Sequence, residues 1–125
     1  MFFSGTYEHK LDPQGRISIP SRFRDAFKAG IILTKGFDQC IVVYTSSEWE
    51  SMAEKITQMP ITQAKARQMM RLTFWRAFQL EMDRQGRVPL PGTLRDYANT
   101  QDEVVIAGTG RLIEIWSKEL WDQQD

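Results

Sequence analysis

The sequence predicts a mainly β protein with short helices, an α+β fold in which two tandem βαβ-like copies of one small unit flank a helical insert. Two observations lead to this prediction. A ten-residue segment that begins at Leu11 recurs almost unchanged from Met82, and the residues before each copy alternate between apolar and polar, as half-buried strands do. At 125 residues, the chain is long enough for one compact domain and short for two independent cores.

The repeated segment reads LDPQGRISIP in the first copy and MDRQGRVPLP in the second. Its Asp, Gln, Gly, Arg and final Pro are identical and its aliphatic positions stay aliphatic, whereas about one identity is expected by chance. The match resumes further on, where Ile41 corresponds to Ile113 and Trp49 to Trp121. Because one unit has too few strands to close a core, we expect the two copies to pack together.

Each copy begins with a strand, a turn and a second strand. The alternating residues of the first strand are Tyr7, His9 and Leu11 in the first copy and Phe78, Leu80 and Met82 in the second. In the turn at 12–15, Asp stands first, Pro second and Gly fourth, as a type I turn favours. The sequence therefore predicts a β-hairpin in each copy, whose tip is the segment from Asp to Arg at 12–16 and 83–87.

A short helix and two more strands complete each copy. In the first copy the helix covers 21–30, where Ser21 can cap its start and Gly30 its end. Phe23 and Phe27, four residues apart, would lie on its buried face. The remaining elements are strands near 31–34 and 40–44 in the first copy, and a helix at 94–98 with strands at 104–107 and 112–116 in the second.

A helical hairpin is predicted between the copies. Ser47 followed by Glu50 is a capping-box signature, which places the start of the first helix there. Pro60 interrupts this helix, and a second one is expected over 62–75. The predicted organisation, together one compact domain, is a first unit over residues 1–46, the insert over 47–76 and a second unit over 77–125.

The doubled Asp-x-x-x-Arg element at 12–16 and 83–87 resembles the hallmark of the MraZ family. The prolines that follow, Pro20 and Pro91, and the closing sequence IEIW at 113–116 resemble that family too. The resemblance covers essentially the whole chain, and the doubled motif is far more specific than either copy alone. Families of this kind usually carry a further C-terminal stretch, so we expect either a short member or a shortened form.

The resemblance implies both a fold and a function. The fold would be a swapped-hairpin β-barrel of the AbrB type, with both halves supplied by one chain. Members form ring-shaped homo-oligomers, here expected to hold about eight to twelve subunits, and bind short direct repeats of double-stranded DNA upstream of the bacterial division and cell-wall operon. They regulate that operon, often as repressors, which implies a cytoplasmic protein associated with the nucleoid.

Arg16 and Arg87 are the first candidates for DNA contact. Each follows a turn glycine and points away from the buried aliphatic face, and a planar guanidinium can bridge guanine O6 and N7 or two phosphate oxygens. The alternative is that each arginine only pairs with the aspartate four residues back and clamps the turn. The first tip has more basic neighbours, so we expect it to lead; the further candidates around the two tips are Lys10, Arg22, Arg24 and Arg84.

The acidic and glycine residues of the motif are predicted to be structural. Asp12 and Asp83 would repel phosphate, so capping of the turn is the stronger interpretation. Gly15 and Gly86 are explained by the backbone requirements of the turn. Arg95 recurs at the position of Arg24, and such charges on short helices are more often solvated or paired with a neighbour.

The residue types argue against an enzyme. One histidine, His9, and one cysteine, Cys40, cannot supply the roughly four N or S ligands of most zinc sites. The segment 108–110 lacks the rest of a phosphate loop and is typical of a hairpin turn. We therefore expect no catalytic residue, metal, cofactor or small-molecule substrate. No apolar run approaches the roughly 18 residues of a membrane span, and a lone thiol fits a reducing cytoplasm.

Net charge leaves the function open at this point. The chain carries 16 basic and 16 acidic residues, which counts against nucleic-acid binding unless the charge is unevenly distributed or many copies assemble. One alternative is an AbrB-type, antitoxin-like protein that acts mainly by binding a protein partner. The doubled motif and the short tail count against it. Another is a ring protein without affinity for DNA, against which the arginine at both tips argues weakly.

Overall fold

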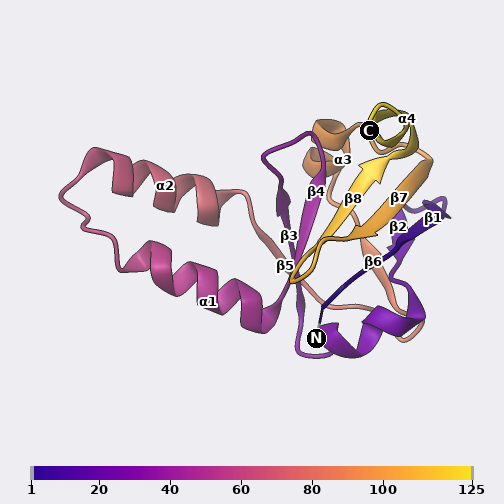
Figure 1. Cartoon of the computed structure of the whole chain (residues 1–125), viewed down its shortest axis with the longest axis horizontal. Helices are drawn as coiled ribbons and strands as arrows, with labels where there is room; N and C mark the ends of the chain where they lie inside the picture. Colours follow the sequence, from indigo (N-terminus) through magenta and orange to yellow (C-terminus); the bar gives the residue numbers. More distant parts are fainter. Residues whose placement is uncertain (1, 125) are drawn as a thin grey trace.

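The computed structural model describes residues 2–124, in which an antiparallel sheet carries a projecting helical hairpin (Figure 1). The strands of the main, six-stranded sheet are β1 (Thr6–Lys10), β3 (Ile31–Lys35), β4 (Ile41–Thr45), β5 (Phe78–Leu80), β7 (Glu103–Gly108) and β8 (Ile113–Ser117). A separate two-stranded sheet pairs β2 (Arg16–Ser18) with β6 (Arg87–Pro89). The predicted α+β class is therefore confirmed.

The strands of the two copies are interleaved in the main sheet. Its order is β1-β7-β8-β4-β3-β5, so β1 of the first copy pairs with β7 of the second, and β5 of the second copy pairs with β3 of the first. The central pair β4–β8 also joins the copies, with Ile41 opposite Ile115. With the β2–β6 ladder of the small sheet included, four ladders between the copies join the two halves into one core. Within residues 2–124 no pairing joins the edge strands β1 and β5, so the closed barrel remains a prediction.

The predicted local hairpin of each copy is wrong. β2 does not pair with β1 but with β6, and only turn-closing hydrogen bonds are local, such as the one from the Gly15 N–H to the Asp12 carbonyl at 2.9 Å. The reason is burial: Ile17 lies opposite Val88 in the β2–β6 ladder, and both side chains are completely buried. A three-residue strand gains this burial from the other copy rather than from its own neighbour.

Helices cover the core next to each short strand. A 3₁₀ helix, η1 (Ser21–Phe27), buries Phe23 and Phe27 against Phe3, with ring centroids 5.1 and 5.5 Å away, so the prediction of their burial is confirmed. The predicted Ser21 cap is wrong, because η1 already begins at Ser21 and no side chain caps it. The second copy has α3 (Gly92–Ala98) at the equivalent place, and α4 (Lys118–Asp122) is the last element of residues 2–124.

The helical hairpin consists of α1 (Ser46–Thr57) and α2 (Ala64–Trp75) and extends away from the sheet (Figure 1). Its predicted start at Ser47 is wrong: the Thr45 hydroxyl accepts the Glu48 N–H at 3.2 Å and caps α1. Thr45 takes this role because β4 runs directly into the helix, and Thr45 is the last residue with extended backbone. No helix within the described residues is long and apolar enough to cross a bilayer. The unit boundaries at 46/47 and 76/77 stay predictions.

Candidate nucleic-acid interface

The pairing of β2 with β6 brings the two Asp-x-x-x-Arg segments to one place on the molecule. We call residues 12–16 the first loop and residues 83–87 the second loop. The Leu90 N–H donates to the Gly15 carbonyl at 3.0 Å, and the Ile19 N–H donates to the Gly86 carbonyl at 2.9 Å. Each loop is therefore bonded to the strand end of the opposite copy, and the two motif arginines lie on one continuous feature.

Each loop is closed by its aspartate. Asp12 Oδ1 accepts the backbone N–H groups of Gln14 at 2.9 Å and Arg16 at 2.8 Å, and Asp12 Oδ2 accepts Arg16 Nε at 2.6 Å. Asp83 makes the same three contacts in the second loop, at 2.8 to 2.9 Å. Gly15 and Gly86 both have φ of 77°, the left-handed conformation that glycine adopts without strain. The two loops thus have one geometry.

These hydrogen bonds also set the charge of the loops. The backbone N–H of Arg16 is the main cause that lowers the pKa of Asp12. Burial, the second-largest effect, opposes it, and the Arg16 side chain and the Gln14 N–H lower the pKa further. The pKa of Asp83 is lowered in the same way by Arg87. Both carboxylates are therefore held ionised, which keeps each motif arginine oriented.

The motif arginines are partly buried and anchored on one side. The side chains of Arg16 and Arg87 are each 29% exposed. Their Nε groups bond the aspartate of their own loop, so the clamp considered from the sequence is formed. Arg16 Nη1 also lies 3.9 Å from Asp83 Oδ2 of the other copy, and within residues 2–124 the terminal nitrogens of Arg87 form no hydrogen bond. Each guanidinium therefore keeps donors for another acceptor.

The other basic candidates lie in less constrained positions. Lys10 is exposed at the end of β1, opposite Glu103 in the ladder. Arg22 is exposed at the start of η1, where Nη1 donates to the Tyr7 hydroxyl at 3.1 Å. Arg84 is exposed within the second loop. Of these three, the structure places only Arg84 in a loop; Lys10 lies on β1 before the first loop, and Arg22 lies on η1, beyond β2.

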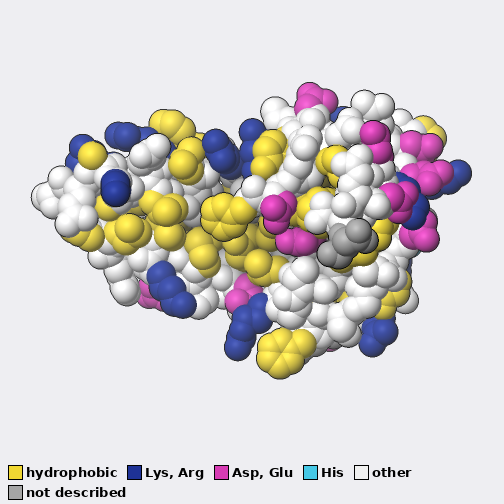
Figure 2. All heavy atoms as spheres, turned by 45° about the horizontal axis from the view of Figure 1, so that its top comes forward, with side chains coloured by type: hydrophobic (Ala, Val, Ile, Leu, Met, Phe, Trp, Pro, Cys, Tyr) yellow, Lys and Arg dark blue, Asp and Glu magenta, His cyan; other side chains and the backbone are white. Residues whose placement is uncertain are grey.

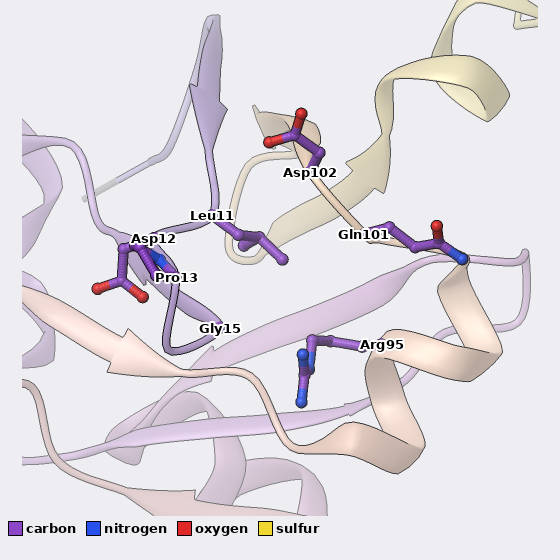
Figure 3. Close-up of a pocket in the computed structure, with 7 residues that line it drawn as sticks. All are labelled: Leu11, Asp12, Pro13, Gly15, Arg95, Gln101 and Asp102. Carbon is purple, nitrogen blue, oxygen red and sulfur yellow. The ribbon is translucent and has the colours of Figure 1, made fainter.

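Arg24 and Arg95 differ from the other candidates because they pack on the loops. Both are half-buried, and their Nε groups donate to the carbonyls of Ile19 at 2.7 Å and Leu90 at 3.0 Å. Figure 3 shows Arg95 extending from α3 toward Gly15, beside a pocket of about 390 Å³ next to the first loop. No role of Arg95 at the loops was predicted from the sequence. The signal available in the sequence was that Arg24 and Arg95 follow the motif arginine of their own copy at the same spacing.

The exposed face of the helical hairpin is a second notable surface. Figure 2 shows hydrophobic side chains along it with Lys and Arg at its margins, whereas most acidic side chains in this view lie toward the opposite end of the molecule. The exposed fraction is 77% for Trp75 and 67% for Ile61. We call this the hairpin surface; its exposed large apolar residues are Ile61, Met69, Leu72, Phe74 and Trp75.

Comparison with known proteins places this architecture in a family. A family profile described as "MraZ protein, putative antitoxin-like" matches residues 2–72 and again residues 73–125, one match for each loop. The chain belongs to the MraZ family. It is 48% identical over 120 residues to "Transcriptional regulator MraZ" of Carboxydothermus hydrogenoformans, covering 96% of this chain and 84% of that protein.

Other MraZ proteins match the chain with similar identity and coverage. The chain is 43% identical over 119 residues to "Transcriptional regulator MraZ" of Roseiflexus castenholzii, which covers 95% of this chain and 83% of the relative. The protein of the same name from Natranaerobius thermophilus is 44% identical over 120 residues, with coverage of 96% and 84%. The matched family is thus one of transcriptional regulators and not of enzymes, as predicted from the residue types.

Two further observations concern possible metal ligands and the lone cysteine. Among residues 2–124, no group of three or more His, Cys, Asp or Glu side chains is arranged to hold a metal ion. Cys40 is completely buried, and burial raises the pKa of its thiol to about 12, so the thiolate that reacts with electrophiles is scarce.

Proposed function

We propose that this chain is a sequence-specific DNA-binding transcriptional regulator whose two loops together form the DNA contact. Its target would be short direct repeats in double-stranded DNA upstream of the bacterial division and cell-wall operon, where its expected action is repression. The observation that carries the proposal is the β2–β6 pairing, which joins two equivalent arginine loops from distant parts of the chain. The regulator names of the MraZ relatives support it.

The loop geometry suits recognition of DNA. Each Nε–carboxylate bond fixes the plane of a guanidinium and leaves its terminal N–H groups for guanine O6 and N7 or for phosphate oxygens. Since each arginine is paired with an ionised aspartate, one subunit supplies little net positive charge. We therefore expect weak binding per subunit and strong binding only where several subunits engage repeated boxes.

The proposal includes a ring-shaped homo-oligomer of about eight to twelve subunits. The hairpin surface supports assembly with a second subunit, because contiguous exposed apolar patches of this kind mark interfaces. Residues 46–76 carry five basic and three acidic side chains, and the acidic end seen in Figure 2 offers a complementary face on the next subunit. The swapped-hairpin barrel belongs to the same proposal, as does a cytoplasmic location at the nucleoid.

The test is fluorescence anisotropy of a labelled duplex from the protein's own upstream region against a shuffled duplex, over a salt series. We expect tighter binding of the native duplex and a steep loss of affinity with salt. Arg16→Ala should lose this binding while it remains folded. Its matched control is Arg111→Ala, because Arg111 is 69% exposed and lies in the turn between β7 and β8. Absence of binding to both duplexes at low salt would reject the proposal in favour of action on a protein partner.

A further inference from the structure

The loops are held from outside by an arginine of the opposite copy. Arg24 Nε donates to the Ile19 carbonyl at 2.7 Å, and the Ile19 N–H donates to the Gly86 carbonyl of the second loop at 2.9 Å. Arg95 and Leu90 repeat this arrangement on Gly15 of the first loop, at 3.0 Å for both bonds. Two hydrogen bonds in series therefore connect each helix arginine to the loop of the other copy.

Direct packing accompanies the hydrogen bonds. A Cβ added to Gly86 would lie 2.6 Å from both Cδ and Cζ of Arg24, and one added to Gly15 would lie 3.1 Å from Cζ of Arg95. Both glycines are buried. The guanidinium groups therefore lie against the loop backbone one residue before the motif arginine, in space that only a glycine leaves open.

The same contacts favour an indirect role for these two arginines. Unlike the motif arginines, whose Nε groups bond a carboxylate, Arg24 bonds the Ile19 carbonyl and packs on the backbone of Gly86, whereas its neighbours Arg22 and Lys28 are exposed. A guanidinium covered by loop backbone on one side and bonded to a carbonyl cannot turn toward a groove without releasing the loop.

We propose that Arg24 and Arg95 are positioning residues: Arg24 holds the second loop, and so Arg87, in its DNA-contacting geometry, and Arg95 does the same for the first loop and Arg16. This inference rests on the proposed function, because it assigns these residues a role in DNA contact. Its specific content is the crossed arrangement, in which a residue of one copy acts only through the loop of the other.

A double-mutant cycle tests the crossed arrangement. With DNA from the upstream region, Arg24→Gln is expected to weaken binding about tenfold in the wild-type background and in the Arg16→Ala background. In the Arg87→Ala background it should change affinity less than about twofold, because the residue through which it acts is already gone. Equal losses in both alanine backgrounds would overturn the proposal and make Arg24 a direct DNA ligand. Lys28→Gln, at the end of the same helix, is the control and should leave affinity unchanged.

Amide hydrogen exchange tests the same idea without DNA. The N–H groups of Gln85, Gly86 and Arg87 are bonded within the second loop. Arg24→Gln should accelerate their exchange and leave the first-loop N–H groups of Gln14 and Arg16 unchanged. Unchanged second-loop exchange would overturn the positioning role. Failure of the wild type to bind DNA would instead reject only the proposed function, since the exchange result would still stand.

A second variant covers loss of folding. Arg24→Lys keeps the charge but lacks the planar group that lies against Gly86. If Arg24→Gln fails to fold, Arg24→Lys should still accelerate second-loop exchange and weaken DNA binding. Wild-type exchange together with wild-type affinity in the lysine variant would contradict the proposal, since charge alone would then suffice.

Discussion

At the scale of single residues, the loops depend on an aspartate that satisfies three donors and on a glycine at a position where a larger residue would be strained. Asp12 accepts two backbone N–H groups and one guanidinium N–H, and Asp83 does the same. Gly15 and Gly86 combine positive φ with contact to an arginine. Each of these features has a measurable consequence.

The first consequence is an acid-sensitive loop. Because the pKa of folded Asp12 lies below its ordinary value of 3.8, the ionised carboxylate stabilises the folded state above that pH, and this contribution is lost as the pH falls through the lowered pKa. An NMR titration of the Asp12 carboxyl carbon should give a midpoint below 3.8. In Arg16→Ala the midpoint should stay low, since the backbone donors remain. A wild-type midpoint at or above the ordinary value would contradict this reading.

The second consequence concerns Gly86→Ala. We expect a loss of about 1–3 kcal/mol in the free energy of unfolding, because the methyl group meets both positive φ and the Arg24 side chain. Gly110→Ala is the matched control: its φ is 94°, but nothing lies within 4 Å of the added Cβ. Urea unfolding should therefore show a larger loss for Gly86→Ala. Equal losses would mean that the contact with Arg24 contributes nothing.

At the scale of elements, the strands follow from the sequence but their partners do not. Alternation identifies which face of a strand is buried, and it correctly marks Ile17 as buried. It does not say what covers that face, and here Val88 of the other copy does so. The same limit applies to Arg24 and Arg95: their recurrence is visible in the sequence, but their contact with the opposite loop depends on the cross-copy pairing.

The position of the N-cap of α1 also depends on a neighbouring element. The sequence around Ser47 matches a capping box, but β4 continues directly into α1, so Thr45 caps the helix. Helix boundaries set by a preceding strand are beyond local sequence signals, because the strand fixes where extended backbone ends.

The prediction at the scale of elements is that removing the core contact between β2 and β6 lowers the free energy of unfolding. Ile17→Ala should cost about 2–5 kcal/mol in the free energy of unfolding, since Ile17 is completely buried. Ser18→Ala, at the partly exposed next position, should change it by less than about 0.5 kcal/mol. Urea unfolding measures both. A cost below about 1 kcal/mol for Ile17→Ala would show that the short ladder is not part of the cooperative core.

At the scale of the whole molecule, the proposed function assigns assembly to the hairpin surface and DNA contact to the paired loops. The sequence predicted the hairpin. It could not show that the apolar side chains of the hairpin surface would remain uncovered in a single chain, because that depends on how the hairpin leaves the sheet (Figure 1). Trp75, at 77% exposure, is the most exposed apolar residue of the hairpin surface, and such exposure is typical of interaction sites.

Assembly through the hairpin surface predicts a defect for Trp75→Asp. The charge should shift the protein toward smaller species in sedimentation velocity without lowering its thermal stability as a monomer, because the side chain is mostly exposed. Ser51→Asp places the same charge on an exposed position of α1 and serves as the control. A wild-type oligomer in the Trp75 variant would exclude this residue from the interface.

The central claim is that both loops contact DNA as one surface, and anisotropy titrations of Arg16→Ala, Arg87→Ala and the double variant over a salt series test it most directly. We expect each single variant to lose about 1–3 kcal/mol of binding to the native duplex, with a shallower salt dependence, and the double variant to lose discrimination against the shuffled duplex. Arg16→Ala should cost more than Arg87→Ala, because the first loop has more basic neighbours. Wild-type affinity and salt dependence in folded single variants would show that the arginines only clamp their loops, and the account would fail.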